Sequence, residues 1–374
     1  MFFCKCCASN FPRTISEIII LRKLLFFNSL LLIFLLSRPL PLFSTEIDSS
    51  HTLTIIAVGD IMMGTDFPKD KLPPNNGSSL LSEVAPILRG GDLTFGNLEG
   101  VLLDGGEPEK TCNDTSLCYL FRTPSSYVEH LKNAGFDVLS LANNHARDFG
   151  EAGRTATMQT LSNAGIQHAG RLGDIATGVI DSVRWALIAF APNPGSYSNL
   201  DQNRAVREIK KLDQTYDLVL VSVHGGAEGK DAIHVVDSME VYYGEERGNM
   251  VEFAHAVIDA GADLVLGHGP HVPRALELYR DRLIAYSLGN FCTYRGVNIA
   301  GINGYAPILV VTLHTSGAFV TGNIISARQY RPQGTRLDAY HRAAKLMQQL
   351  TLEDFPQTAI SIDAQGLISR KKAK

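Results

Sequence analysis

Three motifs that mark common enzyme classes are missing from this sequence of 374 residues. It contains no GxxxxGK[ST] phosphate-binding loop, no GxGxxG dinucleotide fingerprint and no GxSxG nucleophile elbow. These absences argue against a P-loop nucleotide hydrolase, a dinucleotide-dependent oxidoreductase and a serine hydrolase of the elbow type. The chain also has no internal repeat, which argues against a repeat architecture.

The sequence has no excess of positive charge either. It holds 34 Lys and Arg residues against 38 Asp and Glu residues, for a formal net charge of -4, and the basic residues form no stripe. Because nucleic-acid binding needs a basic surface, we expect no nucleic-acid partner. With 45% hydrophobic and 19% charged residues, the length suits one large α/β domain or two smaller ones with a substantial core.

The N-terminus carries the features of a signal peptide. Residues 18–36 read IIILRKLLFFNSLLLIFLL, in which Arg22 and Lys23 precede a long apolar run. A membrane span needs about 20 apolar residues, and no small-x-small cleavage site follows, so a cleaved signal and an uncleaved anchor both stay open. A buried helix of the globular domain is disfavoured by the all-round hydrophobicity. We expect residues 1–44 to form a signal peptide or membrane anchor with a short exit linker. The remainder is then exported, periplasmic or extracellular, and either soluble or tethered through residues 18–36.

The six cysteines lie on both sides of this segment. Three precede the apolar run and would stay on the cytoplasmic side or be removed. Cys112 and Cys118 flank a short polar loop of the exported part, where we favour a local disulfide over two free thiols. Cys292 follows an apolar strand and is expected to be a small buried residue.

Strand-like and helix-like segments alternate along the rest of the chain, which predicts an α/β fold with a parallel or mixed sheet. Residues 306–330 predict a hairpin that turns at Ser316 and Gly317, and residues 248–260 predict a helix. We expect one main domain over residues 53–330, followed by a C-terminal helix and polar tail over residues 331–374.

Polar side chains close five of the predicted strands. They are Asp60, then Asn97 and Glu99, then Asn143, Asn144 and His145, then His224, and finally His268 and His271. In open α/β sheets ligands bind outside the carboxyl ends of the strands. Carboxylates, amide oxygens and imidazoles are ligands for divalent metals. The pattern therefore predicts a metal site at this edge.

Each of these residues alone has an ordinary explanation. Asp60 could cap a helix, Glu99 could be a solvated charge, and His224 could be a core histidine bonded to a carbonyl. The paired asparagines and the last two histidines suit turns with nothing bound. Since five strand ends would each have to carry such a residue by coincidence, we favour the metal site.

Seven stretches together resemble the poly-gamma-glutamate capsule-synthesis (CapA-type) family, which looks like a branch of the calcineurin-like metallophosphoesterases. They are VGDIMMG, GDLTFGNLEG, FRTP, AGFDVLSLANNHARDFG, VHGGAE, AGADLVLGHGPHV and IAYSLGNF, and the resemblance extends from about Leu53 to Phe291. The resemblance implies a four-layer α-β-β-α sandwich, metallophosphoesterase-like, with a dinuclear centre that binds two divalent ions (Mn, Zn or Fe).

Carried over by position, the resemblance implies a set of metal ligands and one histidine near the reacting group. The ligands are Asp60, Glu99 assisted by Asn97, Asn144, His224, His268 and His271, and the reacting-group histidine is His145. Two departures are visible. Ile61 and Met62 follow Asp60, so the usual D-x-H motif lacks its histidine, and the final histidines are spaced i, i+3 instead of i, i+2. The metal number, the metal identity and phosphoesterase activity therefore stay open.

The implied chemistry is metal-dependent hydrolysis by an activated water. His145 would protonate the leaving oxygen, and Arg122 would hold a phosphoester or carboxylate substrate or form a surface salt bridge. Glu228 would orient an imidazole or be a loop charge. We expect a hydrolase of cell-envelope polymer synthesis, with an anionic polymer as substrate and a membrane-bound polymer synthase complex as possible partner. The alternative is a non-catalytic envelope component that binds or guides such a polymer.

Overall fold

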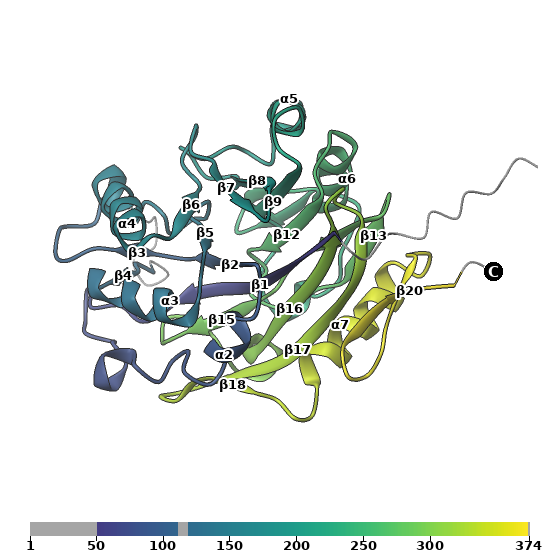
Figure 1. Cartoon of the computed structure of the whole chain (residues 1–374). Helices are drawn as coiled ribbons and strands as arrows, with labels where there is room; N and C mark the ends of the chain where they lie inside the picture. The colour runs from purple at the N-terminus through teal and green to yellow at the C-terminus, as the bar shows by residue number, and fades with distance from the viewer. Residues whose placement is uncertain (1–50, 111–118, 373–374) are drawn as a thin grey trace, which may run out of the picture. The chain divides into compact units, whose positions relative to one another are not determined.

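The computed structural model describes residues 51–110 and 119–372, and strands of this part form two large sheets (Figure 1). The predicted signal or anchor segment and the Cys112–Cys118 pair lie outside the described residues. Within the described ranges, no helix is both long and apolar enough to cross a membrane. Cys292 is buried, as expected, and carries a free thiol.

The first sheet has ten strands and is mixed. Its order is β19 (Ile360–Ile362), β20 (Leu367–Arg370), β17 (Phe319–Tyr330), β16 (Tyr305–His314), β1 (Thr52–Met62), β2 (Leu93–Leu98), β5 (Val138–Ser140) and β6 (Gln167–Ala169), while β15 (Asn290–Thr293) pairs with β1 and β18 (Gly334–Leu337) with β17. Strands β1, β2 and β5 run parallel, so their carboxyl ends meet at one edge. Strands β16 and β17 form the hairpin expected around Ser316 and Gly317, where the Gly317 N–H donates to the His314 carbonyl at 2.8 Å.

The second sheet has six strands. Its order is β13 (Leu276–Tyr279), β14 (Arg282–Ala285), β12 (Leu264–His268), β9 (Leu218–His224), β8 (Val183–Phe190) and β7 (Ala176–Ile180). Strands β8, β9 and β12 are parallel neighbours, so β9 and β12 also end together. Two small sheets, β3 (Val101–Leu102) with β4 (Arg122–Thr123) and β10 (Glu240–Tyr242) with β11 (Glu245–Gly248), lie in the connections.

Helices cover the sheets. They are α2 (Ala85–Leu88), α3 (Val128–Ala134), α4 (Gly150–Ala164), α5 (Gln202–Asp213), α6 (Met250–Asp259) and α7 (Arg342–Asp354), with 3-10 turns η1 (Pro74–Gly77), η3 (Ser125–Tyr127), η4 (Lys230–Ala232) and η5 (Gly301–Gly304). Helix α6 occupies most of the predicted 248–260 segment. It begins after Asn249, whose side chain accepts hydrogen bonds from the N–H groups of Val251 and Glu252.

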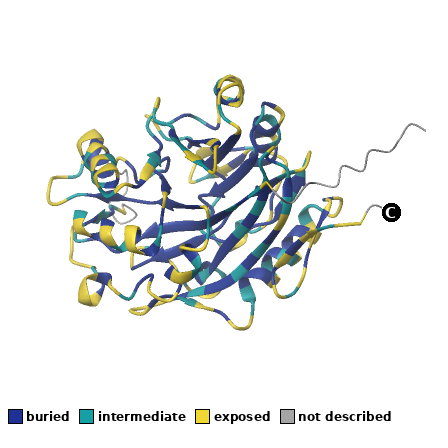
Figure 2. Ribbon diagram, in the orientation of Figure 1, coloured by how far each residue is buried: buried dark blue, intermediate teal, exposed yellow. Residues whose placement is uncertain are grey.

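The alternation of side chains along each central strand explains the layering. On β1, Ile55 and Ala57 join the core between the two sheets, while Ile56 and Val58 face the core shared with α2, α3 and α4. On β9 and β12, even-numbered leucines enter the same inter-sheet core, while odd-numbered valines face α5 and α6. Because successive strand residues point to opposite faces, a strand covered on both sides must be apolar throughout. Figure 2 shows the strands buried and the outer sides of the helices exposed.

The expected four-layer α-β-β-α sandwich is therefore confirmed: helices, ten-stranded sheet, six-stranded sheet, helices. Helix α7 adds Ala344 and Met347 to the inter-sheet core. Segments β18, α7, β19 and β20, all beyond residue 330, belong to this same sandwich, since three of them extend the first sheet.

Candidate metal centre

Strand β1 brings Asp60 to the edge of the first sheet. Asp60 is fully buried, in register with Asn97 on β2 and with Asn290 on β15. The Asn97 Nδ2 donates to Asp60 Oδ1 at 2.8 Å. The preceding residue must be glycine, because a Cβ at Gly59 would lie 1.9 Å from the Gly289 carbonyl oxygen. This close approach lets the Asp60 N–H donate to that same carbonyl at 2.8 Å.

The second sheet supplies two histidines. His224 ends β9 and His268 ends β12, and the two are register partners on these parallel strands. Both side chains are buried, with exposed fractions of 1% and 0%. The β9 chain turns away at once, and the Gly225 N–H donates to the His268 carbonyl at 2.9 Å.

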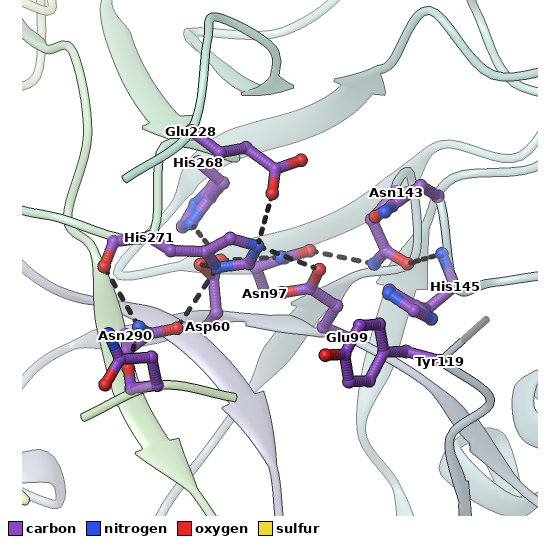
Figure 3. A network of polar contacts seen from close by, with 12 residues as sticks. Asp60, Asn97, Glu99, Tyr119, Asn143, His145, Glu228, His268, His271 and Asn290 are labelled. Carbon is purple, nitrogen blue, oxygen red and sulfur yellow. Dashed lines mark hydrogen bonds and ion pairs between the residues drawn. The ribbon is translucent and has the colours of Figure 1, made fainter. Parts of the chain in front are cut away.

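The two sheets meet around Asp60 (Figure 3). One carboxylate oxygen, Oδ1, lies 3.3 Å from His268 Nδ1, and the other, Oδ2, lies 3.0 Å from His271 Nδ1. The far nitrogen of His271 lies 3.6 Å from Glu99 Oε1. Asp60, Glu99 and His271 each offer a ligand atom, and these atoms lie within 4.8 Å of one another. Residues far apart in the sequence thus converge on one small volume.

His271 stands in the turn after β12 and has a left-handed backbone with φ of 59°. Left-handed φ is uncommon for a non-glycine residue and clusters at functional sites. Asn290 holds this turn, since its Nδ2 donates to the His271 carbonyl at 2.9 Å and its Oδ1 lies 3.1 Å from His271 Nδ1. The i, i+3 spacing therefore places His268 on the strand and His271 on the turn, with both rings against Asp60.

Several buried polar atoms at this edge have no hydrogen-bond partner in the described part of the chain. They are Glu99 Oε1, Asn144 Oδ1, both ring nitrogens of His224 and the Nε2 of His268, whose Nδ1 lies 3.3 Å from Asp60 Oδ1. Buried polar groups in proteins are nearly always paired, so such a group of orphaned atoms points to a missing ligand. Imidazole nitrogen, carboxylate oxygen and amide oxygen are donors to divalent transition metals. The residues present therefore fit a divalent cation.

Burial and charge together control the protonation of this cluster. Burial alone would raise the pKa of Asp60, but hydrogen bonds and charge attraction from His268 and His271 outweigh it and hold that pKa well below its usual range. Burial raises the pKa of Glu99 to about 8, with Asp60 and Glu228 adding to the rise and His271 opposing it. Burial opposes a charge on His271, yet Glu99, Asp60 and Glu228 raise its pKa to about 10. Burial also puts the pKa of His224 well below its usual value, so His224 is neutral.

His145 lies beside the cluster with one ring nitrogen already engaged. Its Nδ1 lies 2.7 Å from Asp148 Oδ2, and Lys110 Nζ lies 2.9 Å from the other oxygen of Asp148. The ring stacks on Phe121 with centroids 4.2 Å apart. Burial, with a contribution from Lys110, lowers the pKa of His145 although Asp148 opposes the change. The neutral ring is thus fixed in orientation, with Nε2 as the nitrogen left for chemistry.

Asn143 and Asn144, which follow β5, have different roles. Asn143 Nδ2 donates to Asn97 Oδ1 at 3.1 Å and to the Leu98 carbonyl at 2.9 Å, and its own Oδ1 accepts from the His145 N–H. Asn143 therefore ties the strand ends together. Asn144 instead keeps a buried side-chain oxygen without a partner.

Arg122 lies apart from the side chains that meet at Asp60. Its Nε donates to Asp66 Oδ1 at 2.6 Å, its Nη1 donates to the Gly106 carbonyl at 2.6 Å, and it stacks over Phe67 and Phe149. These contacts occupy the guanidinium group within the protein. The binding of a substrate by Arg122 therefore stays a prediction. Glu228 does reach the cluster, with Oε2 3.9 Å from His271 Nε2 and Oε1 3.2 Å from Arg247 Nη1.

Sequence reasoning missed Asn290, Asp148 and Lys110. Asn290 sits at a strand start in the quoted stretch IAYSLGNF, and Asp148 follows His145 at i+3 in NNHARD. Asp148 therefore lay close to a predicted strand end, whereas Asn290 opens β15 and its position gave no such signal. Lys110 carried no signal, because only the fold brings its loop against Asp148.

This geometry defines the class of protein. It is a four-layer α/β sandwich with a buried cluster of carboxylates and histidines at the ends of its two sheets. Residues 54–295 match the family described as bacterial capsule synthesis protein PGA_cap. The chain belongs to this family, as its motifs predicted.

Individual relatives agree with the family assignment. The chain is 29% identical to the capsule biosynthesis protein CapA of Bacillus anthracis over 268 residues, which covers 66% of this chain and 61% of the relative. It is 29% identical to the PGA biosynthesis protein CapA of Bacillus subtilis (strain 168) over 266 residues, or 66% of this chain and 65% of the relative. A probable polyglutamine synthesis accessory protein of Mycobacterium tuberculosis (strain ATCC 25618 / H37Rv) is also 29% identical, over 63% of this chain and 64% of the relative. The chain thus spans less than two thirds of the length of these relatives.

Solved structures give a weaker similarity. A putative 5'-nucleotidase from Staphylococcus aureus in complex with alpha-ketoglutarate covers 80% of this chain, with 58% of its own length, 12% identity and a TM-score of 0.40. The NAD nucleotidase of Haemophilus influenzae covers 84% of this chain, with 57% of its own length, 12% identity and a TM-score of 0.42. Similarity at this level supports no conclusion beyond what the strands and side chains of this chain show themselves.

Proposed function

We propose that this protein is an exported, metal-dependent hydrolase, metallophosphoesterase-like, that acts in the synthesis of an anionic cell-envelope polymer of the poly-gamma-glutamate type. The observation that carries the proposal is the set of buried, unpaired ligand atoms on Glu99, Asn144, His224 and His268, which lie at the strand ends of the two sheets. The polymer is suggested by the names of the relatives, which concern capsule and PGA biosynthesis.

The proposed ligands form two groups. Asp60, Glu99 and His271 would hold one divalent ion, because their ligand atoms already lie within 4.8 Å of one another. His224, His268 through Nε2, and Asn144 through Oδ1 would hold a second, because these donor atoms are buried and unpaired. Mn, Zn or Fe suits this mixture of nitrogen and oxygen donors. When bound, such ions lower the pKa of a water toward neutrality and stabilise the oxygens of a displacement reaction.

The residues of the chain would then bind, orient and move a proton. Asp148 accepts from His145 Nδ1 at 2.7 Å, so Nε2 of the neutral ring carries the lone pair. It would take up a proton from the attacking water and pass it to the leaving oxygen. Asn97 and Asn290 would orient Asp60 and His271, since each makes a hydrogen bond to its partner of about 3 Å.

The cellular setting is part of the proposal. Residues 18–36 have the composition of a signal peptide or anchor, so the sandwich would work outside the cytoplasmic membrane. A membrane-bound polymer synthase complex would be its partner there.

The test is elemental analysis of the purified full-length chain, together with Asp60→Asn and His268→Ala variants. We expect near-stoichiometric Mn, Zn or Fe in the wild type and loss of metal in both variants. His255→Ala is a matched control, because that histidine pairs with Glu277 at 2.9 Å on another part of the second sheet. The wild type should then hydrolyse one member of a panel of phosphoesters and γ-glutamyl amides. Folded protein that takes up no metal would overturn the proposal, and bound metal without turnover would favour the non-catalytic polymer-binding component.

A further inference from the structure

The two ring nitrogens of His271 have different surroundings. Nδ1 lies 3.0 Å from Asp60 Oδ2 and 3.1 Å from Asn290 Oδ1. The orientation of the Asn290 amide is fixed, because its Nδ2 donates to the carbonyls of His271 and Asn303 at 2.9 and 3.2 Å. Its Oδ1 therefore accepts a hydrogen bond, and Nδ1 of His271 carries the proton. In the neutral ring the lone pair then lies on Nε2, which is the nitrogen that can bind a metal.

Two carboxylates lie near that nitrogen. Glu99 Oε1 lies 3.6 Å and Glu228 Oε2 lies 3.9 Å from His271 Nε2, and Figure 3 shows both groups directed toward the ring. Ligand atoms that share one metal ion, at bonds of about 2.0–2.2 Å, lie roughly 3–3.6 Å from one another. Each carboxylate oxygen is thus within a few tenths of an ångström of the separation from Nε2 that a shared ion requires.

An orienting role for Glu228 does not fit this arrangement. A carboxylate that orients a metal-bound imidazole accepts the N–H of the nitrogen that is not bound to the metal. In His271 that N–H is Nδ1, which already faces Asp60 and Asn290. Glu228 lies on the Nε2 side, where a metal-bound ring has no proton to donate. The Glu228 carboxylate can therefore contact the ion itself, but it cannot orient the ring.

The Glu228 carboxylate is held through its other oxygen. Oε1 lies 3.2 Å from Nη1 of Arg247, whose side chain is 5% exposed, and Oε2 is the oxygen that faces His271. The loop is also attached to the turn that carries His271, because the Gly229 N–H donates to the Pro270 carbonyl at 2.9 Å. A carboxylate that binds a metal is itself commonly held by a neighbouring hydrogen-bond donor. Arg247 would be that donor for Glu228.

Carboxylates prevail in this half of the centre. Strand β1 contributes Asp60, while Met62 offers only a thioether sulfur, which accepts the Gly64 N–H at 3.3 Å. With Glu228 included, three carboxylates and one imidazole surround the first ion, whereas two imidazoles and an amide oxygen form the second group. Carboxylates suit Mn²⁺, and imidazoles suit Zn²⁺. The two groups therefore differ in the metal that they prefer.

We infer that Glu228 is a ligand of the first ion through Oε2, with Arg247 as the residue that positions it, and that this oxygen-rich site selects Mn²⁺. The inference rests on the proposed function for the presence of the two ions. It adds a fourth protein ligand to Asp60, Glu99 and His271. It also assigns Nε2 as the ligating nitrogen of His271.

The test is a Mn²⁺ titration of the metal-free full-length protein, with free Mn²⁺ measured by electron paramagnetic resonance. We expect two sites in the wild type. Glu228→Gln, which keeps the size of the side chain, should weaken one site by roughly tenfold or more and leave the other unchanged. Glu245→Gln is the matched control, because Glu245 pairs with the same Arg247 at 3.1 Å but its side chain is 65% exposed. It should bind both ions as the wild type does.

A second variant, Glu228→His, separates a metal ligand from a loop charge. Histidine binds metals but cannot form an ion pair with Arg247. Compared with Glu228→Gln, this variant should recover metal binding at the weakened site, with the preference shifted from Mn²⁺ toward Zn²⁺. Competition between the two metals, followed by elemental analysis, measures the shift.

The outcomes for Glu228 and for the proposed function are distinct. Two Mn²⁺ sites of wild-type affinity in Glu228→Gln would overturn the inference, and hydrolysis by the wild type would still support the proposed function. A Mn²⁺ site that depends on Glu228, in a protein that hydrolyses no member of the substrate panel, would support the inference and count against the hydrolase. A wild type that binds no Mn²⁺ would overturn both.

Discussion

His224 and His268 lie side by side in register at the ends of two parallel strands, and neither nitrogen of His224 nor the Nε2 of His268 has a hydrogen bond. Each unsatisfied buried polar group costs about 1–3 kcal/mol. A fold that keeps two such rings side by side is destabilised unless a ligand occupies their nitrogens. Metal binding and stability should therefore be linked in this protein.

This linkage predicts opposite effects of one substitution in two conditions. His224→Leu should abolish most metal binding and lower the Tm of the metal-loaded protein. After chelation, the same variant should equal the wild type in stability or exceed it by about 1–2 kcal/mol, because the unsatisfied nitrogens are gone. Thermal unfolding with and without chelator measures both. His255→Leu, which removes a ring paired with Glu277 and stacked on Tyr279, should show no chelator dependence beyond the wild type, and a similar pattern in both variants would contradict the linkage.

Asp148 should affect turnover without affecting metal. Asp148→Asn replaces the carboxylate that fixes His145 and pairs with Lys110, so we expect kcat to fall about 10²–10⁴-fold at unchanged metal content. Asp174→Asn is the control, because Asp174 also contacts the Nδ1 of a histidine, His168, at 2.9 Å, away from the cluster. Steady-state kinetics with elemental analysis decides, and full activity in the Asp148 variant would mean that His145 is not the acid.

The loop that carries Glu228 depends on a buried ion pair. Arg274 is 0% exposed, donates to both oxygens of Glu240 at 2.9 and 2.8 Å, and also donates to the Ala227 carbonyl at 3.0 Å. Glu240→Gln should destabilise the protein by about 3–5 kcal/mol, because it leaves the Arg274 charge buried and unpaired. Urea unfolding measures the loss. The double variant Glu240→Met with Arg274→Leu should recover part of it, and no recovery would show that the carbonyl contacts of Arg274 carry the stability.

Asp263 gives the protein a defined pH dependence. Burial raises the pKa of Asp263 to about 6, although the Val219 N–H and Arg282 oppose the rise. In the unfolded chain the pKa of an aspartate is about 3.9, so between these two pH values the folded state binds more proton than the unfolded state. Stability should therefore decrease as the pH rises from about 4 to about 6, by about 2 kcal/mol from this group. Asp263→Asn should remove that decrease in unfolding measured by urea across this range, and an unchanged difference between pH 4 and pH 6 would refute it.

Much of the fold and of the candidate site could be predicted from the sequence, because the apolar pattern of a buried strand shows which residues lie on each face and where the strand ends. Apolar runs such as 53–58 and 218–223 identify strands covered on both sides, and Asp60 and His224 mark where those runs stop. The hairpin at Ser316 and Gly317 was equally readable from its turn residues. Asn290 and Asp148 lay in quoted stretches but were not singled out, since an asparagine opening a strand and an aspartate in a loop look ordinary by themselves.

The sequence by itself determined the alternation of strands and helices, the family motifs, and the types of donor atom at each strand end, because these depend on residue types and local periodicity. Only the tertiary structure decided which donors meet. Asp60 touches His268 and His271 because the two sheets pack face to face with their strand ends aligned. Arg122, which the sequence suggested for substrate binding, forms an ion pair with Asp66, and Lys110 forms one with Asp148. Such contacts follow from sheet order and close backbone approach, as at Gly59, which no local pattern encodes.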